Sequence, residues 1–96
     1  MAREYLPKIY KLSPQWGVQG QIIKIEGVNF GPTFKPGTVG VDGEEMPIKF
    51  WSEKLVIAEQ PIPKNFGKVD IHIIRNDGVI SNGMRFQIRD PNELEN

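Results

Sequence analysis

Apolar and polar residues alternate along much of the chain with a period of two, the spacing of a strand that buries one face and exposes the other. Ile23 and Ile25, for example, alternate with Lys24 and Glu26. Seven stretches carry apolar residues that fit strands: Ile9 to Leu12; Ile23 and Ile25; Val39 and Val41; Met46, Ile48 and Phe50; Leu55 and Ile57; Val69, Ile71 and Ile73; Met84, Phe86 and Ile88. No stretch shows convincing helical spacing. The pattern predicts an all-β protein of about seven antiparallel strands.

Residues that favour turns separate these stretches. Asp42-Gly43 predicts a tight hairpin, because Asp and Gly tolerate the positive φ that such turns need. Proline, which cannot pair inside a sheet, occurs together with glycine in residues 31–37 and 61–67. Short strands divided by frequent turns indicate a β-sandwich or a barrel.

Strand parity predicts where the termini and loops of such a sandwich lie. If seven strands run up and down, the first and the last point the same way, so the termini lie at opposite ends. The loops sort into two groups for the same reason. Residues 27–38, 51–54 and 76–83 are expected at the N-terminal end, and residues 13–20, 42–45 and 60–67 at the C-terminal end.

The composition narrows the function classes. The chain of 96 residues has the length of one domain, and without cysteine it must rely on one apolar core rather than on disulfides or thiolate metal sites. Twelve Lys and Arg balance twelve Asp and Glu without forming a basic run. We therefore expect no nucleic-acid partner and no attraction to anionic membranes. No apolar stretch approaches the roughly 18 residues of a membrane span, so we expect no membrane insertion.

A series of short motifs resembles a known family over roughly residues 7–88. The motifs are Pro7-x-Ile9, Leu12-Ser13-Pro14, Gly17, Gly20, Ile23-x-Ile25-x-Gly27-x-Asn29-Phe30-Gly31, Val39-x-Val41, Asp42-Gly43, Trp51-Ser52, Pro61-Ile62-Pro63, Gly67-x-Val69-x-Ile71, Ser81-Asn82-Gly83 and Phe86-x-Ile88. In this order they resemble the IPT/TIG domain, the immunoglobulin-like fold shared by plexins and transcription factors. The segment from Ile23 to Gly31 is the most specific part.

The resemblance implies an immunoglobulin-like β-sandwich of the E-set type. It implies one domain over residues 1–96, with a core over 7–89 and a linker-like acidic tail over 90–96. Members of the family include receptor and bacterial surface modules, domains attached to polysaccharide-acting enzymes, and the dimerisation half of Rel-type transcription factors. The family implies no catalytic activity and no universal ligand site, so no binding residue is carried over from it.

Two groups of polar residues were weighed as chemical sites. His72, the only histidine, shares a predicted strand face with Asp70, but residues two apart on a strand are poorly placed to bond as members of a catalytic triad. Asp42, Glu44 and Glu45 cluster at the predicted hairpin, but calcium needs about six oxygens in a shaped loop. Both groups are interpreted as solvated surface. We expect no catalytic residue, no metal site and no cofactor.

Aromatic residues near the loops are the best candidates for an interaction surface. Phe34 and Trp51 are expected near the N-terminal end, and Trp16 and Phe66 near the C-terminal end. Exposed aromatics are common interface anchors, whereas in a small sandwich they more often close the ends of the core. Trp16 and Phe66 form the preferred pair, because loop sorting brings both to the end where a following domain would attach.

The function predicted from these observations is a noncatalytic spacer or protein-interaction module of a larger extracellular or cell-surface protein, with a bacterial surface protein favoured. The alternative is an accessory carbohydrate-binding or structural domain of a polysaccharide-acting enzyme. Expected partners are neighbouring domains of the same chain, another protein or a glycan. The N-terminus lacks the apolar segment of a signal peptide, so we expect a domain cut from a longer chain. The cysteine-free composition also fits the cytoplasm.

Overall fold

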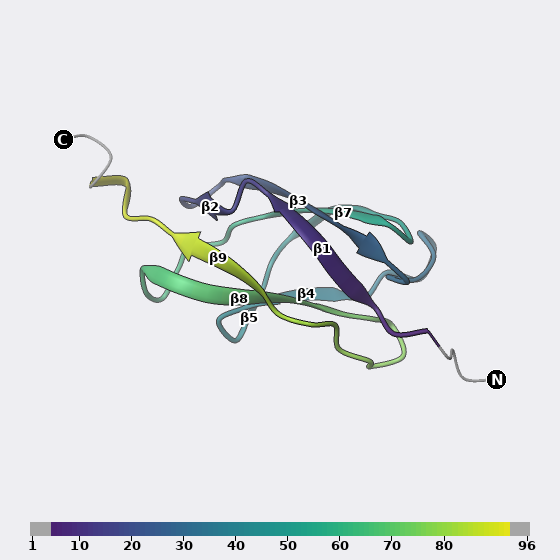
Figure 1. Cartoon of the computed structure of the whole chain (residues 1–96). Helices are drawn as coiled ribbons and strands as arrows, with labels where there is room; N and C mark the ends of the chain where they lie inside the picture. The colour runs from purple at the N-terminus through teal and green to yellow at the C-terminus, as the bar shows by residue number, and fades with distance from the viewer. Residues whose placement is uncertain (1–4, 93–96) are drawn as a thin grey trace.

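Two β-sheets pack face to face in the computed structural model, which describes residues 5–92 (Figure 1). The first four residues, and residues 93–96 of the predicted acidic tail, lie outside the described residues. One sheet has four strands in the order β1 (Lys8–Ser13), β3 (Ile22–Val28), β7 (Leu55–Glu59) and β6 (Ile48–Trp51). The other has five, in the order β2 (Trp16–Gly17), β9 (Met84–Ile88), β8 (Gly67–Ile74), β4 (Thr38–Val41) and β5 (Glu44–Glu45). The predicted all-β sandwich is confirmed.

Neighbouring strands are antiparallel except for β2, which runs parallel to β9. The chain leaves the four-stranded sheet at the end of β1 and joins the five-stranded sheet as β2, where Trp16 lies opposite Gln87. The sequence predicted about seven strands and missed β2 and β5, whose residues it treated as loops. Two residues are too few to show a period of two, so only the tertiary pairing reveals these strands.

The core lies between the sheets and follows the predicted alternation in β3, β8 and β9. Phe30, which follows β3, closes one end of it and is fully buried. The buried apolar side chains are Ile9, Leu12, Ile23, Ile25, Phe30, Val39, Val41, Met46, Trp51, Val56, Ala58, Ile71, Ile73, Phe86 and Ile88. Together they form a single cluster, which is the one apolar core that a cysteine-free domain needs.

The predicted alternation was wrong in β6 and β7. The register between these strands shifts between Ile48 and Phe50, which is the signature of a β-bulge. A shift of one residue sends the following side chains to the other face of the sheet. Phe50 therefore points outward, whereas Trp51 turns into the core opposite Val56. In β7 the buried residues are Val56 and Ala58, not the predicted Leu55 and Ile57.

The chain enters and leaves the sandwich at opposite ends, as strand parity predicted (Figure 1). Hydrogen bonds confirm the grouping of the loops. At the N-terminal end, the backbone amide of Phe30 donates to the carbonyl of Glu53 over 3.0 Å. At the C-terminal end, the amide of Gly20 donates to the carbonyl of Gln60 over 2.8 Å, and Lys64 forms an ion pair with Glu44 over 3.7 Å.

Candidate interaction surfaces

Trp51 closes the core at the N-terminal end and does not belong to a surface. Its side chain is 3% exposed, and its ring lies tilted against that of Phe30 with centroids 6.4 Å apart. The indole Nε1 donates a hydrogen bond of 3.1 Å to the carbonyl of Gly31. The sequence-based assignment of Trp51 to an interaction surface was therefore wrong, and the bulge in β6 is the reason. A buried indole N–H needs an acceptor, and the carbonyl of Gly31 supplies one.

Trp16 and Phe66 remain on the surface of the C-terminal end. Trp16 is 44% exposed and Phe66 is 54% exposed. The guanidinium of Arg89 lies 5.3 Å from the centre of the Trp16 ring, a cation–π contact that fixes the indole while leaving part of it in solvent. Within residues 5–92, Phe30 and Trp51 form the only aromatic ring pair, so the rings of Trp16 and Phe66 share an end without contacting each other.

Phe34 is the most exposed of the predicted site residues. It lies in the β3–β4 connection at the N-terminal end and is 81% exposed. A shallow depression of about 540 Å³ adjoins it, with Pro32 on its own loop and Ser52 and Lys54 on the β6–β7 connection. The structure therefore separates the four predicted residues into one core residue, one surface residue at the N-terminal end and two at the C-terminal end.

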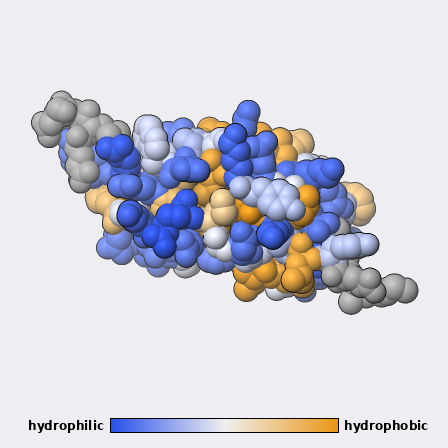
Figure 2. All heavy atoms as spheres, viewed as in Figure 1, coloured by the Kyte–Doolittle hydropathy of each residue, from blue (hydrophilic) through white to orange (hydrophobic). Residues whose placement is uncertain are grey.

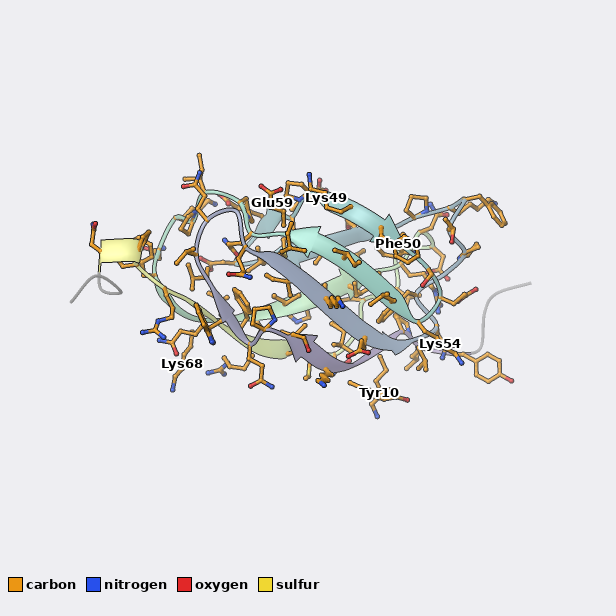
Figure 3. The ribbon with its side chains drawn as sticks, turned by 90° about the horizontal axis from the view of Figure 1, so that it is seen from above. Tyr10, Lys49, Phe50, Lys54, Glu59 and Lys68 are labelled. Atoms are coloured by element: carbon orange, nitrogen blue, oxygen red, sulfur yellow. The ribbon has the colours of Figure 1, made fainter. Side chains whose placement is uncertain are left out.

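The outer face of the four-stranded sheet carries a further exposed aromatic residue, Phe50. It lies opposite Ile57 of β7, and beside it Lys49 forms an ion pair of 3.3 Å with Glu59 (Figure 3). The same view shows Lys54 toward the N-terminal end and Lys68 toward the C-terminal end. Phe50 was missed as a surface residue because its place in the alternation predicted burial.

Arg75 is the main polar residue that the sequence analysis missed. It follows β8 and is 3% exposed, and its guanidinium donates to the carbonyl of Tyr5 over 2.6 Å and to that of Asn29 over 3.2 Å. Two further bonds, of 2.9 and 3.0 Å, reach the carboxylate of Asp77. These bonds hold the pKa of the Asp77 carboxyl below its ordinary value of 3.8. The alternation of apolar and polar residues gives no signal for Arg75, because its hydrogen-bond partners Tyr5 and Asn29 lie far away in the sequence.

Two asparagines hold the N-terminal segment at further points. The amide of Asn29 donates to the carbonyl of Leu6 over 3.1 Å. The side chain of Asn82 accepts from the backbone N–H of Ile9 over 2.7 Å and donates to its carbonyl over 3.1 Å. Together with Arg75, these contacts tie the segment that leads into β1 to the loops of the N-terminal end.

Two of the carboxylates weighed as parts of chemical sites pair with basic side chains instead. The carboxylate of Asp70 accepts a hydrogen bond of 3.1 Å from Arg85, and no bond joins it to His72 within the described part of the chain. Glu44 pairs with Lys64, as described above. No group of three or more His, Cys, Asp or Glu residues that could hold a metal ion occurs within residues 5–92.

These features define a class: an immunoglobulin-like β-sandwich domain whose chain enters and leaves at opposite ends. The chain belongs to the IPT/TIG domain family, whose family model matches residues 7–88. The family resemblance inferred from the motifs is thus confirmed. A comparison with curated proteins found no match. No helix in the described part of the chain is long and apolar enough to cross a membrane.

Solved structures contain similar domains. A part of gamma-CGTase from Alkalophilic bacillus clarkii is similar with a TM-score of 0.81 and 32% identity, over 86% of this chain and 12% of that one. Auxiliary nutrient binding proteins from Bacteroides thetaiotaomicron and Bacteroides ovatus give TM-scores of 0.72 and 0.69, at 19% and 16% identity. In both cases 90% of this chain and 21% of the other are covered, and the likeness concerns the fold alone. The chain thus spans 12–21% of the length of these three proteins, in which the fold forms one part of a larger protein.

Proposed function

We propose that this chain is a noncatalytic module of a larger extracellular or cell-surface protein, in which it holds neighbouring domains at a fixed separation and orientation. The observation that carries the proposal is the course of the chain, which enters the sandwich at one end and leaves at the other (Figure 1). A module built in this way lengthens a protein by its own long dimension. The small share of each similar protein that the fold occupies also supports a modular role.

A spacer of this kind needs stiff ends, and the hydrogen bonds provide them. At the N-terminal end, Arg75, Asn29 and Asn82 hold the backbone of the segment from Tyr5 to Ile9. At the C-terminal end, the parallel pairing continues past β9, since the amide of Arg89 donates to the carbonyl of Gly17 over 2.8 Å. Backbone that is bonded to the body of a domain cannot swivel freely, so the directions of both neighbours are restricted.

The exposed apolar side chains at the two ends suit contacts with neighbouring domains. The N-terminal end presents Tyr5, Leu6 and Phe34, and the C-terminal end presents Trp16 and Phe66. Interfaces between domains of one chain resemble transient protein–protein interfaces, in which aromatic residues are enriched. Under this proposal the exposed aromatics serve packing between domains, and the charged faces of the sheets remain in solvent.

Fluorescence energy transfer tests the spacer function. The natural absence of cysteine allows one dye to be attached to a domain fused before residue 1 and another to a domain fused after residue 96. We expect a narrow distribution of transfer efficiencies in single molecules. A Gly-Ser linker of the same length provides the control and behaves as a flexible coil with a broad distribution. An equally broad distribution for the natural domain would contradict the proposal.

An accessory role beside a polysaccharide-acting enzyme is the second candidate. It is favoured by the 32% identity with part of gamma-CGTase, which is an enzyme. In that role the domain would pack on its catalytic neighbour or bind substrate for it, without contributing a catalytic group. Assay of the parent protein with and without this domain, on soluble and on insoluble polysaccharide, tests the role. Activity that is unchanged on both substrates would contradict it.

A further inference from the structure

The outer face of the five-stranded sheet is hollowed by a groove of about 470 Å³ over β4 and β8. Its lining includes Gly40, Asp42, Lys68, His72, Ile74 and Ile80. The apolar end of the groove lies by Ile74 and Ile80, which bridge β8 to the β8–β9 connection. In Figure 2, viewed with this sheet below, apolar side chains gather at the lower edge toward the N-terminal end.

Gly40 opens the groove, and the fold itself does not require a glycine there. Gly40 lies within β4 opposite His72, and its φ angle is outside the left-handed region that favours glycine. A Cβ at Gly40 would meet its nearest atom, Cδ1 of Ile74, at an ordinary contact distance of 3.8 Å. At Gly37, by contrast, a Cβ would lie 2.0 Å from a backbone oxygen. Glycine weakens a strand interior and often marks a place where a ligand approaches closely, so its presence at position 40 points to an occupant.

His72 lies between two glycines on this face. Gly40 is its partner on β4, and Gly83 lies on its other side, where a Cβ would stand 2.8 Å from the Nε2 atom of the imidazole. The ring therefore leans over Gly83 and leaves the space above Gly40 open. The imidazole remains half-buried, so one polar ring with a donor and an acceptor forms part of the wall of the groove.

The charges around the groove are balanced. Lys68 is exposed and forms no ion pair with any described residue, and Asp42 stands exposed at the turn that borders the groove. Asp70 is neutralised by its bond to Arg85. A polyanion would meet the carboxylates, and a polycation would meet Lys68, so neither is favoured. Separate donors and acceptors beside an apolar patch instead match a neutral polyol.

Trp16 extends this surface toward the C-terminal end. Gln87 of β9 is the register partner of Trp16 on one side and of Lys68 on the other, so the three form a row across the outer face. The C–H face of a sugar ring can stack on an exposed aromatic ring, while its hydroxyl groups pair with flanking polar side chains. Ile80, which is exposed at the opposite end, offers a second apolar contact.

We infer that the outer face of the five-stranded sheet is a binding site for a neutral saccharide, with Gly40 providing the space, His72, Lys68 and Asp42 the hydrogen bonds, and Trp16 a stacking platform. This inference goes beyond the spacer function, which depends on the course of the chain and on the two ends of the domain. The two proposals share Trp16 alone, which lies where the outer sheet face meets the C-terminal end. The two proposals can fail independently, because energy transfer between fused domains tests the spacer function and titration of the isolated chain tests saccharide binding.

Binding to the isolated chain tests the inference by NMR titration of 15N-labelled protein with neutral gluco- and mannooligosaccharides at millimolar concentration. We expect shift changes confined to residues around Gly40, His72 and Lys68 and to Trp16. His72→Ala should weaken binding about tenfold, the loss in affinity expected when one hydrogen-bond partner of the ligand is removed. Gly40→Thr should abolish binding and at the same time raise the midpoint of thermal unfolding, because a β-branched residue favours the strand.

Ile22→Thr is the matched control, because it places the same residue type on the outer face of the other sheet. Its affinity should equal that of the natural chain. Absence of binding to every neutral oligosaccharide, or shift changes at the loops of either end instead of the groove, would overturn the inference. So would binding that survives in folded Gly40→Thr. Stronger binding to polygalacturonate or to a peptide than to any neutral sugar would overturn the assigned ligand class.

Discussion

The two tryptophans have opposite environments, although the sequence analysis expected both near loops. Trp51 donates its indole N–H to the carbonyl of the buried residue Gly31, and its ring packs on Phe30, whereas Trp16 lies half in solvent under the guanidinium of Arg89. Substitution of Trp51 by Phe keeps an aromatic ring and removes the donor. A buried carbonyl left without its partner costs about 1–3 kcal/mol.

We therefore expect Trp51→Phe to lower the free energy of unfolding by about 1–3 kcal/mol in urea denaturation. Trp16→Phe should change it by less than about 0.5 kcal/mol, since surface substitutions seldom do more. The two variants also separate the fluorescence of the two indoles. Equal destabilisation by both variants would contradict the assignment of Trp51 to the core and Trp16 to the surface.

Asp77 makes the stability of the folded protein depend on pH. The Arg75 guanidinium lowers the pKa of the Asp77 carboxyl in the folded protein, so this carboxylate stabilises the fold above its unfolded-state pKa. That contribution is lost as the pH falls below 3.8 and through the lowered folded-state value. We expect Asp77→Asn to be less stable than the natural chain at neutral pH, and the difference to shrink in strong acid. A difference that stays constant across acid urea denaturation curves would contradict this.

At the scale of elements, β1 depends on a side chain from the β8–β9 connection. The side chain of Asn82 bonds both the N–H and the carbonyl of Ile9. Ile9 lies directly before the register shift in β1 that leaves Tyr10 exposed. Asn82→Ala removes both bonds, at about 1 kcal/mol for a typical hydrogen bond. We expect faster amide exchange at Ile9 with little change in the centre of β3. Asn76→Ala, in the exposed turn after β8, is the control and should leave that exchange unchanged.

At the scale of the whole molecule, one contiguous core joins the two sheets. A single domain of this kind unfolds in one cooperative step. We expect the calorimetric and van't Hoff enthalpies of the isolated chain to agree, at about 60–80 kcal/mol for a domain near this size. Phe30→Ala, which empties a fully buried position, should lower stability by about 3–5 kcal/mol. Two separate transitions would show that the sheets do not share one core.

The proposed functions also belong to the scale of the whole molecule. The separation of the neighbouring domains depends on both ends, because a stiff N-terminal segment restricts their relative orientation only if the C-terminal end is also stiff. The groove over β4 and β8 depends on one sheet alone. A domain that holds its neighbours apart with its ends keeps the groove over β4 and β8 free for a ligand, and Trp16 is the one residue that both proposals use.

The sequence by itself determined the all-β class, the position of the Asp42-Gly43 hairpin and the grouping of the loops. The class and the hairpin depend on local chemistry, namely a period of two and the backbone freedom of Asp and Gly. The grouping of the loops depends on the alternating direction of the longer strands, which the two missed short strands do not change. The prediction for β3 and β8 held because both strands keep one register along their length.

Only the tertiary structure decided which face Phe50 and Trp51 occupy, because a bulge depends on the partner strand and leaves no mark on the alternation. The same is true of the candidate sites. Arg75 bonds a residue 70 positions away, and the groove over Gly40 exists only because β4 and β8 lie side by side. The sequence determined what is local in this protein, and contacts between distant segments decided the rest.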